Sequence, residues 1–290
     1  MKLIVKLFAL LFIPLLIVSK TIACTIFTAS NGETVMFGGN EDQTPNSSFL
    51  VVDNGGTFGV VYFATPWKEI PLVMQMGINE KGLCYDANWI PKEKLNPHPE
   101  RKSQNEWAVT QLMRGASTVE EVLSKIFTYN WGSSISYQVH FADRSGDAAV
   151  IHPGTNGELT YTRKSKGDGY LISTNFNLAK LDKGDWSSSY SSDRYETANK
   201  MLSNIGTQND LTVEFMASVL KATHRRYGRV KTLYSVVYDL QNLGIYLYYD
   251  RRFESPYILN VKEELAKTTF RRKVSLTDLI SNRNLNKKKN

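Results

Sequence analysis

The chain has 290 residues, of which 42% are hydrophobic and 11% aromatic, and its formal net charge is +7. This composition is ordinary for a globular protein and excludes a disordered or fibrous chain. Part of the positive charge lies at the two ends, in Lys2, Lys6 and 287–289, and no recognition helix, zinc spacing or aromatic-basic repeat is present. We therefore expect no nucleic-acid partner.

The first 23 residues have the three parts of a secretory signal peptide. Lys2 and Lys6 give a positive start, an apolar run covers 7–18, and small Ala23 directly precedes Cys24. The run is too short for a comfortable membrane span, and no later run is long enough for one. We expect removal of residues 1–23, a periplasmic or secreted product without a stable membrane span, and one domain over 24–290 with a basic, frayed tail at 284–290.

Cleavage after Ala23 would place a thiol and a free α-amine on the same residue, Cys24. An α-amine has a pKa near ~8, so its neutral fraction can take the proton of an adjacent nucleophile. Two alternatives remain open. Cys24 could be acylated as in bacterial lipoproteins, although the usual box has Leu where this chain has Thr21. It could also be an ordinary buried strand cysteine. A bridge to Cys84 would consume the nucleophile.

The pattern of apolar runs and turns predicts strands first, then two helical pairs inserted between further strands. A loop is expected at 91–99, and the Gly38-Gly39 pair interrupts the second strand. This order favours an α+β arrangement of antiparallel sheets covered by helices and argues against a Rossmann-like alternation. The predicted strands are 25–28, 35–37, 49–52, 59–63, 72–76, 83–85, 136–142, 148–152, 158–162, 169–174, 232–239 and 245–249, and the predicted helices are 104–113, 121–127 (after a capping box at 117–120), 193–203 and 212–222.

Several kinds of active site are excluded by their missing motifs. There is no Gly-x-Ser-x-Gly nucleophile elbow, no phosphate-binding glycine loop and no His-Glu-x-x-His. The four histidines lack metal-ligand spacing, and His140 and His152 fall on strands, where a structural role is the commoner one. We expect neither a metal nor a cofactor.

A terminal-cysteine enzyme needs a group that holds the α-amine and donors that face an oxyanion. Asp42 follows the glycine pair, and its carboxylate could orient the amine. Asn175 ends a strand and Asn88 follows one, so either could donate to an oxyanion. Asp42 and Asn175 could instead be turn or cap residues, which from the sequence alone is the commoner role of such residues. The aromatic residues that could line an apolar acyl pocket, although core packing is their commoner use, are Phe63, Trp67, Tyr85 and Trp89.

Taken together, seven segments resemble the choloylglycine hydrolase and penicillin V acylase family of N-terminal-nucleophile hydrolases, whose relatives include linear-amide C–N hydrolases and acyltransferases. They follow the family's order over nearly the whole processed chain. They are 24–27 (CTIF), 37–42 (FGGNED), 77–83 (GINEKGL), 140–147 (HFADRSGD), 173–176 (STNF), 191–195 (SSDRY) and 234–240 (YSVVYDL).

The resemblance implies a four-layer αββα fold in which Cys24 attacks an amide carbonyl. It also implies that Asp42 holds the α-amine, that Asn175 and a group near Asn88 form the oxyanion hole, and that water hydrolyses an acyl-thioester. Relatives commonly form tetramers, which implies a homo-oligomer.

Two positions depart from the family pattern. Many members of the bile-salt and penicillin branch carry an arginine where this chain has Gly39, and Asn40 is more similar to the acyltransferase and linear-amide branches. The family's late arginine falls on Lys231, with Arg229 as a nearby substitute. Lysine supplies the positive charge but not the planar fork of arginine.

The sequence thus predicts an exported amidohydrolase that cleaves the C–N bond of small N-acyl compounds. The candidate substrates are phenoxyacetyl amides such as penicillin V, conjugated bile salts, and fatty-acyl amides such as acyl homoserine lactones. The alternatives are an acyltransferase of the same fold and a lipid-anchored, non-catalytic binding protein acylated at Cys24.

Overall fold

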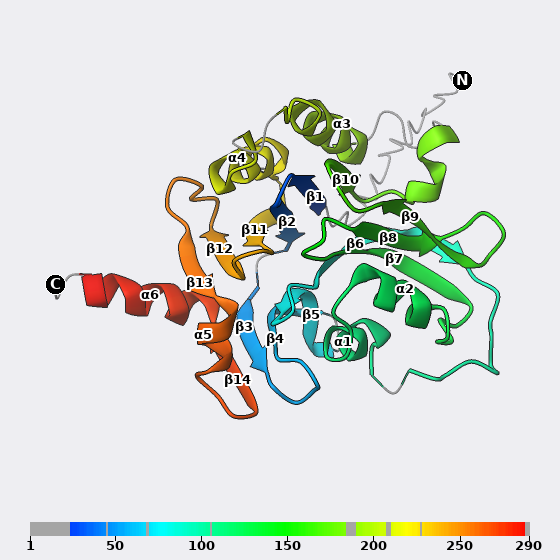
Figure 1. Cartoon of the computed structure of the whole chain (residues 1–290), viewed down its shortest axis with the longest axis horizontal. Helices are drawn as coiled ribbons and strands as arrows, with labels where there is room; N and C mark the ends of the chain where they lie inside the picture. The colour runs from blue at the N-terminus through cyan, green and yellow to red at the C-terminus, as the bar shows by residue number, and fades with distance from the viewer. Residues whose placement is uncertain are drawn as a thin grey trace, which may run out of the picture.

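The computed structural model describes residues 24–44, 46–67, 70–104, 106–183, 190–206, 210–226 and 228–287. The predicted signal peptide lies outside the described residues. Two antiparallel sheets make up most of the structure (Figure 1). The six-stranded sheet has the order β10 (Gly169–Ser173), β1 (Thr25–Asn31), β2 (Thr34–Gln43), β11 (Lys231–Asp239), β12 (Gly244–Tyr249) and β13 (Tyr257–Asn260). The eight-stranded sheet has the order β14 (Arg271–Ser275), β3 (Phe49–Asp53), β4 (Val60–Trp67), β5 (Ile70–Asn79), β6 (Cys84–Lys94), β7 (Ser134–Ala142), β8 (Ala148–Pro153) and β9 (Leu159–Lys164).

The two sheets face one another, and each has a helical pair on its outer face (Figure 1). Ile26, Phe37 and Phe63 pack between the sheets. Alternate residues of the same strands, such as Phe27, point the other way, as the two-residue period of a strand requires. The helices are α3 (Tyr190–Leu202) and α4 (Val213–Thr223) on the six-stranded sheet, and α1 (Ala108–Met113) and α2 (Val119–Ile126) on the eight-stranded sheet. The predicted four-layer αββα fold is confirmed.

The glycine pair in β2 does not interrupt the strand, as the sequence pattern had suggested, but lets it pack closely. β2 is continuous from Thr34 to Gln43. A Cβ atom at Gly38 would lie 2.9 Å from the ring of Phe27, and one at Gly39 would overlap the Asp86 carboxylate. Residue 40 then ties the strand to the helical layer, because Asn40 Nδ2 donates to the Leu220 carbonyl at 3.0 Å.

The helices differ from their predicted limits because side chains cap their ends. α1 begins at Ala108, and the Gln104 amide oxygen accepts from the Ala108 N–H at 3.1 Å, so Gln104 lies before the helix. Thr118 is the N-cap of α2 and accepts from the Glu121 N–H at 3.2 Å, one residue later than the predicted capping box. Before these helices, β6 continues to Lys94 into the predicted loop, because it pairs with β7 there.

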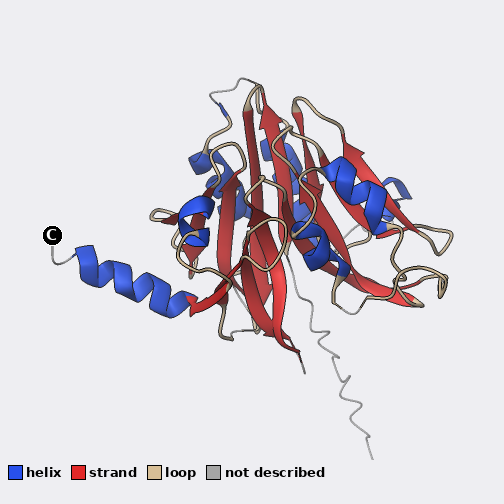
Figure 2. Cartoon of the chain, turned by 60° about the horizontal axis from the view of Figure 1, so that its bottom comes forward, coloured by secondary structure: helices blue, strands red, loops and turns tan. Residues whose placement is uncertain are grey.

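The C-terminal elements were not predicted. β13 is followed by α5 (Val261–Leu265), β14 and α6 (Leu276–Lys287). Earlier in the chain, a 3₁₀ helix at Leu178–Lys183, which follows β10, was not predicted either. β14 is an edge strand with three consecutive basic residues, so its sequence lacks the apolar alternation that marks a strand. α6 extends away from the sheets, and it remains helical to Lys287 where the sequence suggested a frayed tail (Figure 2). No helix in the described part of the chain is both long and apolar enough to cross a membrane.

Candidate active site

Cys24 lies directly before β1, the strand between β10 and β2, and its side chain is buried. Its carbonyl oxygen accepts from Asn88 Nδ2 at 3.2 Å and from Arg194 Nη1 at 2.6 Å. The residue is therefore held from both sides, by β6 of the other sheet and by helix α3. Cys24 and Cys84 are both free, so no bridge consumes the thiol.

Arg194 is the buried cation of the site, and sequence reasoning gave it no role. It is 3% exposed and also donates to Thr25 Oγ1 at 2.6 Å and to Asn175 Oδ1 at 2.8 Å. The Tyr190 ring lies 5.2 Å from its guanidinium carbon. A charged helical residue is ordinarily taken to face solvent, which is why Arg194 was missed. The available signal was its place in the SSDRY segment of the family resemblance.

Asp42 lies beside the thiol, as predicted for the group that holds the α-amine. Its backbone N–H hydrogen-bonds the Cys24 sulfur, and its Oδ1 accepts from the Thr232 hydroxyl. Among the described residues, Oδ2 is buried and has no hydrogen-bond partner. Burial raises the pKa of Asp42 to about 7, and the Arg194 charge opposes this rise. The free oxygen can accept from a further donor placed at Cys24.

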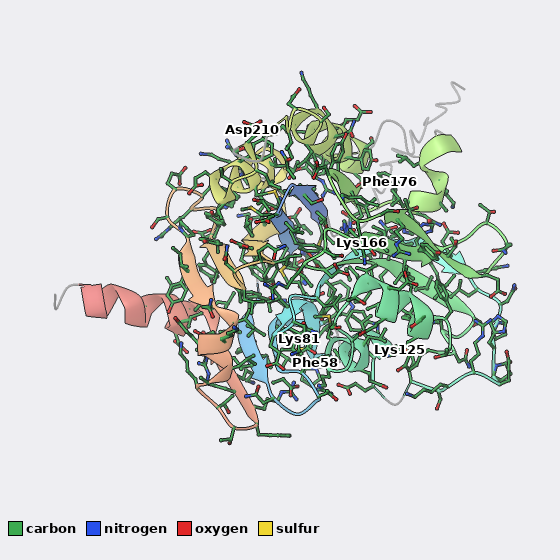
Figure 3. All side chains as sticks on the ribbon, in the orientation of Figure 1. Phe58, Lys81, Lys125, Lys166, Phe176 and Asp210 are labelled. Atoms are coloured by element: carbon green, nitrogen blue, oxygen red, sulfur yellow. The ribbon has the colours of Figure 1, made fainter. Side chains whose placement is uncertain are left out.

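The two predicted oxyanion donors come from different sheets and bond different backbone carbonyls. Asn88 bonds the Cys24 carbonyl, whereas Asn175 Nδ2 donates to the Trp89 carbonyl at 2.8 Å. Each amide nitrogen carries two N–H groups, so each retains one for an incoming oxyanion. The residue after Asn175, Phe176 (labelled in Figure 3), packs edge-on against Tyr195 of α3 at 5.5 Å between ring centroids.

The structure does not bring Lys231 to the nucleophile. Lys231 is exposed at the start of β11 and lies opposite Gln43, and Arg229 is exposed in the preceding turn. In the part of the chain that the structure describes, the cation that contacts Cys24 is Arg194. Lys231 lies at the start of a strand, at the margin of the sheet, where its side chain reaches solvent. Arg194 lies on the buried face of α3, which packs on the sheet.

Two further carboxyl groups, of Glu41 and Asp86, lie by the thiol and were missed by sequence reasoning. Both are buried. Burial raises the pKa of Glu41 to about 8. Burial is also the larger cause of the raised pKa of Asp86, and the charge of Glu41 is the smaller one. Burial, then the charges of these carboxylates and of Asp42, raise the pKa of the Cys24 thiol well above its usual range. The thiol therefore needs an adjacent base to react.

A cavity of about 710 Å³ begins at the thiol. The lining residues at its buried end are Cys24, Glu41, Gln43 and Asn88. Three other lining residues are exposed, and they are Ile70, Glu106 and Arg271. The apolar part of the wall consists of Trp67, Leu72, Val73, Met74, Ala87, Trp89, Trp107 and Tyr137.

Two of the four predicted pocket aromatics, Trp67 and Trp89, line this cavity. Phe63 does not, because it faces the space between the sheets and packs on Tyr234 at 5.5 Å. Tyr85 does not either, because it points into the layer under α1, where its hydroxyl donates to the Met74 carbonyl at 2.8 Å. A strand's alternation sends neighbouring residues to opposite faces, and the sequence alone did not show which face the cavity occupies.

The described residues contain no group of three or more histidine, cysteine or acidic side chains placed to hold a metal ion. His140 lies between the sheets and bonds the hydroxyls of Thr28 at 3.0 Å and Ser173 at 3.1 Å. Burial lowers its pKa to about 3, so the ring is neutral and has the structural role expected of it.

A four-layer αββα fold with a cysteine at the head of an inner strand defines the N-terminal-nucleophile class of proteins. A family model described as acyl-coenzyme A:6-aminopenicillanic acid acyl-transferase matches residues 28–253, so the chain belongs to this family. This agrees with the predicted resemblance to choloylglycine hydrolases and penicillin V acylases. No curated protein matches the chain.

Solved structures of conjugated bile acid hydrolase from Clostridium perfringens are similar in fold. A mutant of that hydrolase, in which alanine replaces a cysteine, has a TM-score of 0.65 and 14% identity, and the match covers 86% of this chain and 96% of that chain. A variant in which leucine replaces an arginine has a TM-score of 0.65 and 13% identity, with 87% of this chain and 97% of that chain covered. At this level of identity the similarity shows the shared fold.

Proposed function

We propose that the chain is exported, is cleaved before Cys24, and hydrolyses the C–N bond of N-acyl compounds with the Cys24 thiol as nucleophile. The observation that carries the proposal is the buried Asp42 Oδ2, which has no partner among the described residues and lies beside Cys24. A buried carboxylate oxygen without a donor is costly. The α-amine of a chain beginning at Cys24 would supply the donor.

The reaction follows from these positions. The neutral α-amine accepts the thiol proton, and the thiolate sulfur bonds to the amide carbonyl carbon. The remaining N–H groups of Asn88 and Asn175 donate to the oxyanion that forms. When the C–N bond breaks, the leaving nitrogen takes the proton from the α-ammonium. Water then attacks the thioester, gives the acid and returns the proton to the thiol.

The apolar wall of the cavity supports an apolar acyl group, as in phenoxyacetyl, bile-acid and fatty-acyl amides. Arg194 supports the site electrostatically, because its charge lies against the Cys24 carbonyl and the Asn175 amide oxygen. The oligomeric state and the compartment remain predictions.

An acyltransferase is the second candidate, and the description of the matching family favours it. In that reaction an amine, not water, would take the acyl group from the thioester. Product analysis with added amine acceptors separates the two activities. A lipid-anchored binding protein would instead show an acylated Cys24 in the intact mass of the exported chain.

The direct test replaces the nucleophile in a chain that begins at residue 24. We expect Cys24→Ala to lose hydrolysis of a panel of N-acyl amides by about 10³-fold or more, since the acyl-thioester can no longer form. The matched control is Cys84→Ala, which removes the other buried thiol, packed between the sheets. Release of free amine is the measurement, and ordinary turnover by Cys24→Ala would contradict the mechanism.

A further inference from the structure

The eight-stranded sheet has an opening next to the nucleophile. β5 and β6 have 10 and 11 residues, but within the described sheet they pair only over Met76–Ile78 and Cys84–Asp86. Beyond these pairs, β5 stays with β4 and β6 stays with β7. The two strands therefore separate between Ile70–Gln75 on one side and Ala87–Lys94 on the other.

Side chains, in place of a neighbouring strand, bond backbone carbonyls near this opening. Tyr85 Oη donates to the Met74 carbonyl at 2.8 Å, and Asn175 Nδ2 donates to the Trp89 carbonyl at 2.8 Å. A register shift in β5 sets Gln75 out of the ladder with β4, and Gln75 Nε2 bonds Thr65 Oγ1 at 2.8 Å. Because buried backbone groups need partners, these contacts stabilise the separated strands.

The cavity that begins at Cys24 passes through the opening. At one end its lining includes Cys24, which directly precedes β1, and Glu41 of β2 in the six-stranded sheet. At the other end it includes Trp107 and Tyr137, which lie on the helical side of the eight-stranded sheet. Trp107 Nε1 donates to Tyr137 Oη at 3.0 Å. The residues between these two ends come from the edges of the opening, and they are Leu72, Val73, Met74, Ala87 and Trp89.

We propose that the opening between β5 and β6 is an acyl channel, which takes a linear apolar acyl chain from the Cys24 thiol through the sheet to the Trp107–Tyr137 pair. The inference rests on the proposed function, which it deepens by assigning linear fatty-acyl amides as the substrate class. A linear acyl chain has a smaller cross-section than a fused-ring acyl group, so it needs a narrower gap between two strands of one sheet. The apolar edges stabilise the chain by removing its methylene groups from water.

Ala87 offers a way to narrow the channel. It is half-buried and lines the cavity where the cavity borders the hydrophobic layer under α1, so a larger side chain there takes up cavity space. We would make Ala87→Val, Ala87→Leu and Ala87→Phe in a Cys84→Ala background, so that Cys24 is the remaining thiol. Ala87→Ser, which is close to alanine in size, is the matched control.

The first measurement is alkylation of Cys24, followed by intact mass, with iodoacetamide and with N-dodecyl iodoacetamide. We expect Ala87→Phe to slow the dodecyl reagent at least tenfold and iodoacetamide less than twofold. Ala87→Leu and Ala87→Val should have intermediate effects on the dodecyl reagent, and Ala87→Ser the smallest. Equal slowing of both reagents, or of neither, would overturn the channel. A steroid-linked iodoacetamide that reacts as fast as the dodecyl reagent would overturn the linear-chain assignment. If the Phe variant does not fold, the graded Val and Leu variants carry the test.

The second measurement is the ratio of kcat/KM for N-dodecanoyl and N-acetyl amides of the same amine. We expect this ratio to fall at least tenfold in Ala87→Phe. If the wild-type chain hydrolyses neither amide while the alkylation pattern holds, the proposed function fails and the channel stands. If both amides are hydrolysed by wild type and the ratio does not change in Ala87→Phe, the channel fails and the proposed function stands.

Discussion

Three buried carboxyl groups, of Glu41, Asp42 and Asp86, surround the Cys24 thiol, and Arg194 is the buried cation that contacts the same residue. Burial disfavours the charged form of each acid, so protons stay on these groups at pH values where solvent-exposed carboxyls are ionised. An α-ammonium at Cys24 would add positive charge to this site, which is why processing before Cys24 matters for its electrostatics.

The pKa of Glu41 predicts how stability changes with pH. Its pKa is about 8 in the folded chain against an ordinary value of 4.5, so the folded state keeps a proton that the unfolded state releases. The free energy of unfolding therefore falls as the pH rises from about 4.5 to about 8, by roughly 1.4 kcal/mol per pH unit at most. We expect Glu41→Gln, which cannot ionise, to match wild type at pH 4 and to be more stable by a few kcal/mol at pH 9.

Urea unfolding at a series of pH values measures this effect. The control is Glu33→Gln, because Glu33 is exposed in the turn between β1 and β2, where a substitution changes stability little. A stability difference between Glu41→Gln and wild type that does not change with pH would show that Glu41 keeps an ordinary pKa.

At this scale the sequence predicted polar residues that follow apolar runs, although the structure places Asp42 inside β2 and Asn88 inside β6. Asp42, Asn88 and Asn175 are polar residues after apolar runs. Asp42 lies beside the thiol, Asn88 bonds the Cys24 carbonyl, and Asn175 is joined to the site through Arg194. Arg194 and Asp86 could not be found in this way. A charged residue within a helix or strand usually faces solvent, and only the packing of distant layers shows that these two do not.

Strand β2 owes its close approach to β6 to a single missing side chain. Gly39 leaves room for the Asp86 carboxylate, which a Cβ atom would overlap. We expect Gly39→Ala to destabilise the fold by about 1–3 kcal/mol, because the two sheets cannot move apart without disturbing the core between them.

A double-mutant cycle checks the cause of this loss. If the overlap with Asp86 is responsible, Gly39→Ala should cost much less in an Asp86→Ala background, since truncation at 86 removes the overlapping atoms. Urea unfolding of the four chains gives the coupling free energy. Additive losses would indicate that the conformational freedom of glycine, and not contact with Asp86, decides the effect.

The sequence predicted most strands and the helical pairs, but not how the strands are ordered. β1 pairs with β10, and β3 with β14, although each pair is far apart in the chain. Hydrophobic periodicity shows which face of a strand is apolar, but it does not identify the strand that lies next to it in the sheet. β14 was missed for a related reason, since its basic edge sequence is stabilised by pairing with β3 and not by a buried face of its own.

For the whole molecule, the proposed function makes activity depend on where the chain begins. We expect a chain with one additional glycine before Cys24 to fold normally and to lose about 10²–10⁴ of its kcat/KM, because a peptide nitrogen cannot act as the general base. A chain that begins at Cys24 is the reference, and intact mass verifies both termini.

Near-UV circular dichroism of the two chains is the control for folding. Equal kcat/KM values for both chains would mean that a side chain, and not the α-amine, activates the thiol. Asp42 would then be the first residue to test, because it bonds the sulfur through its N–H and has a raised pKa.

The separation of β5 from β6 also divides the site into parts that differ in their tolerance of change. Cys24 precedes a strand with partners on both sides, so substitutions near it disturb two ladders of hydrogen bonds. The cavity wall, in contrast, comes from strand segments that border an opening, where a new side chain meets empty space. If the proposed function holds, evolution can therefore alter the acyl group that the cavity accepts while Cys24 and its partners stay in place. Related chains should vary most between 70 and 75 and between 89 and 94.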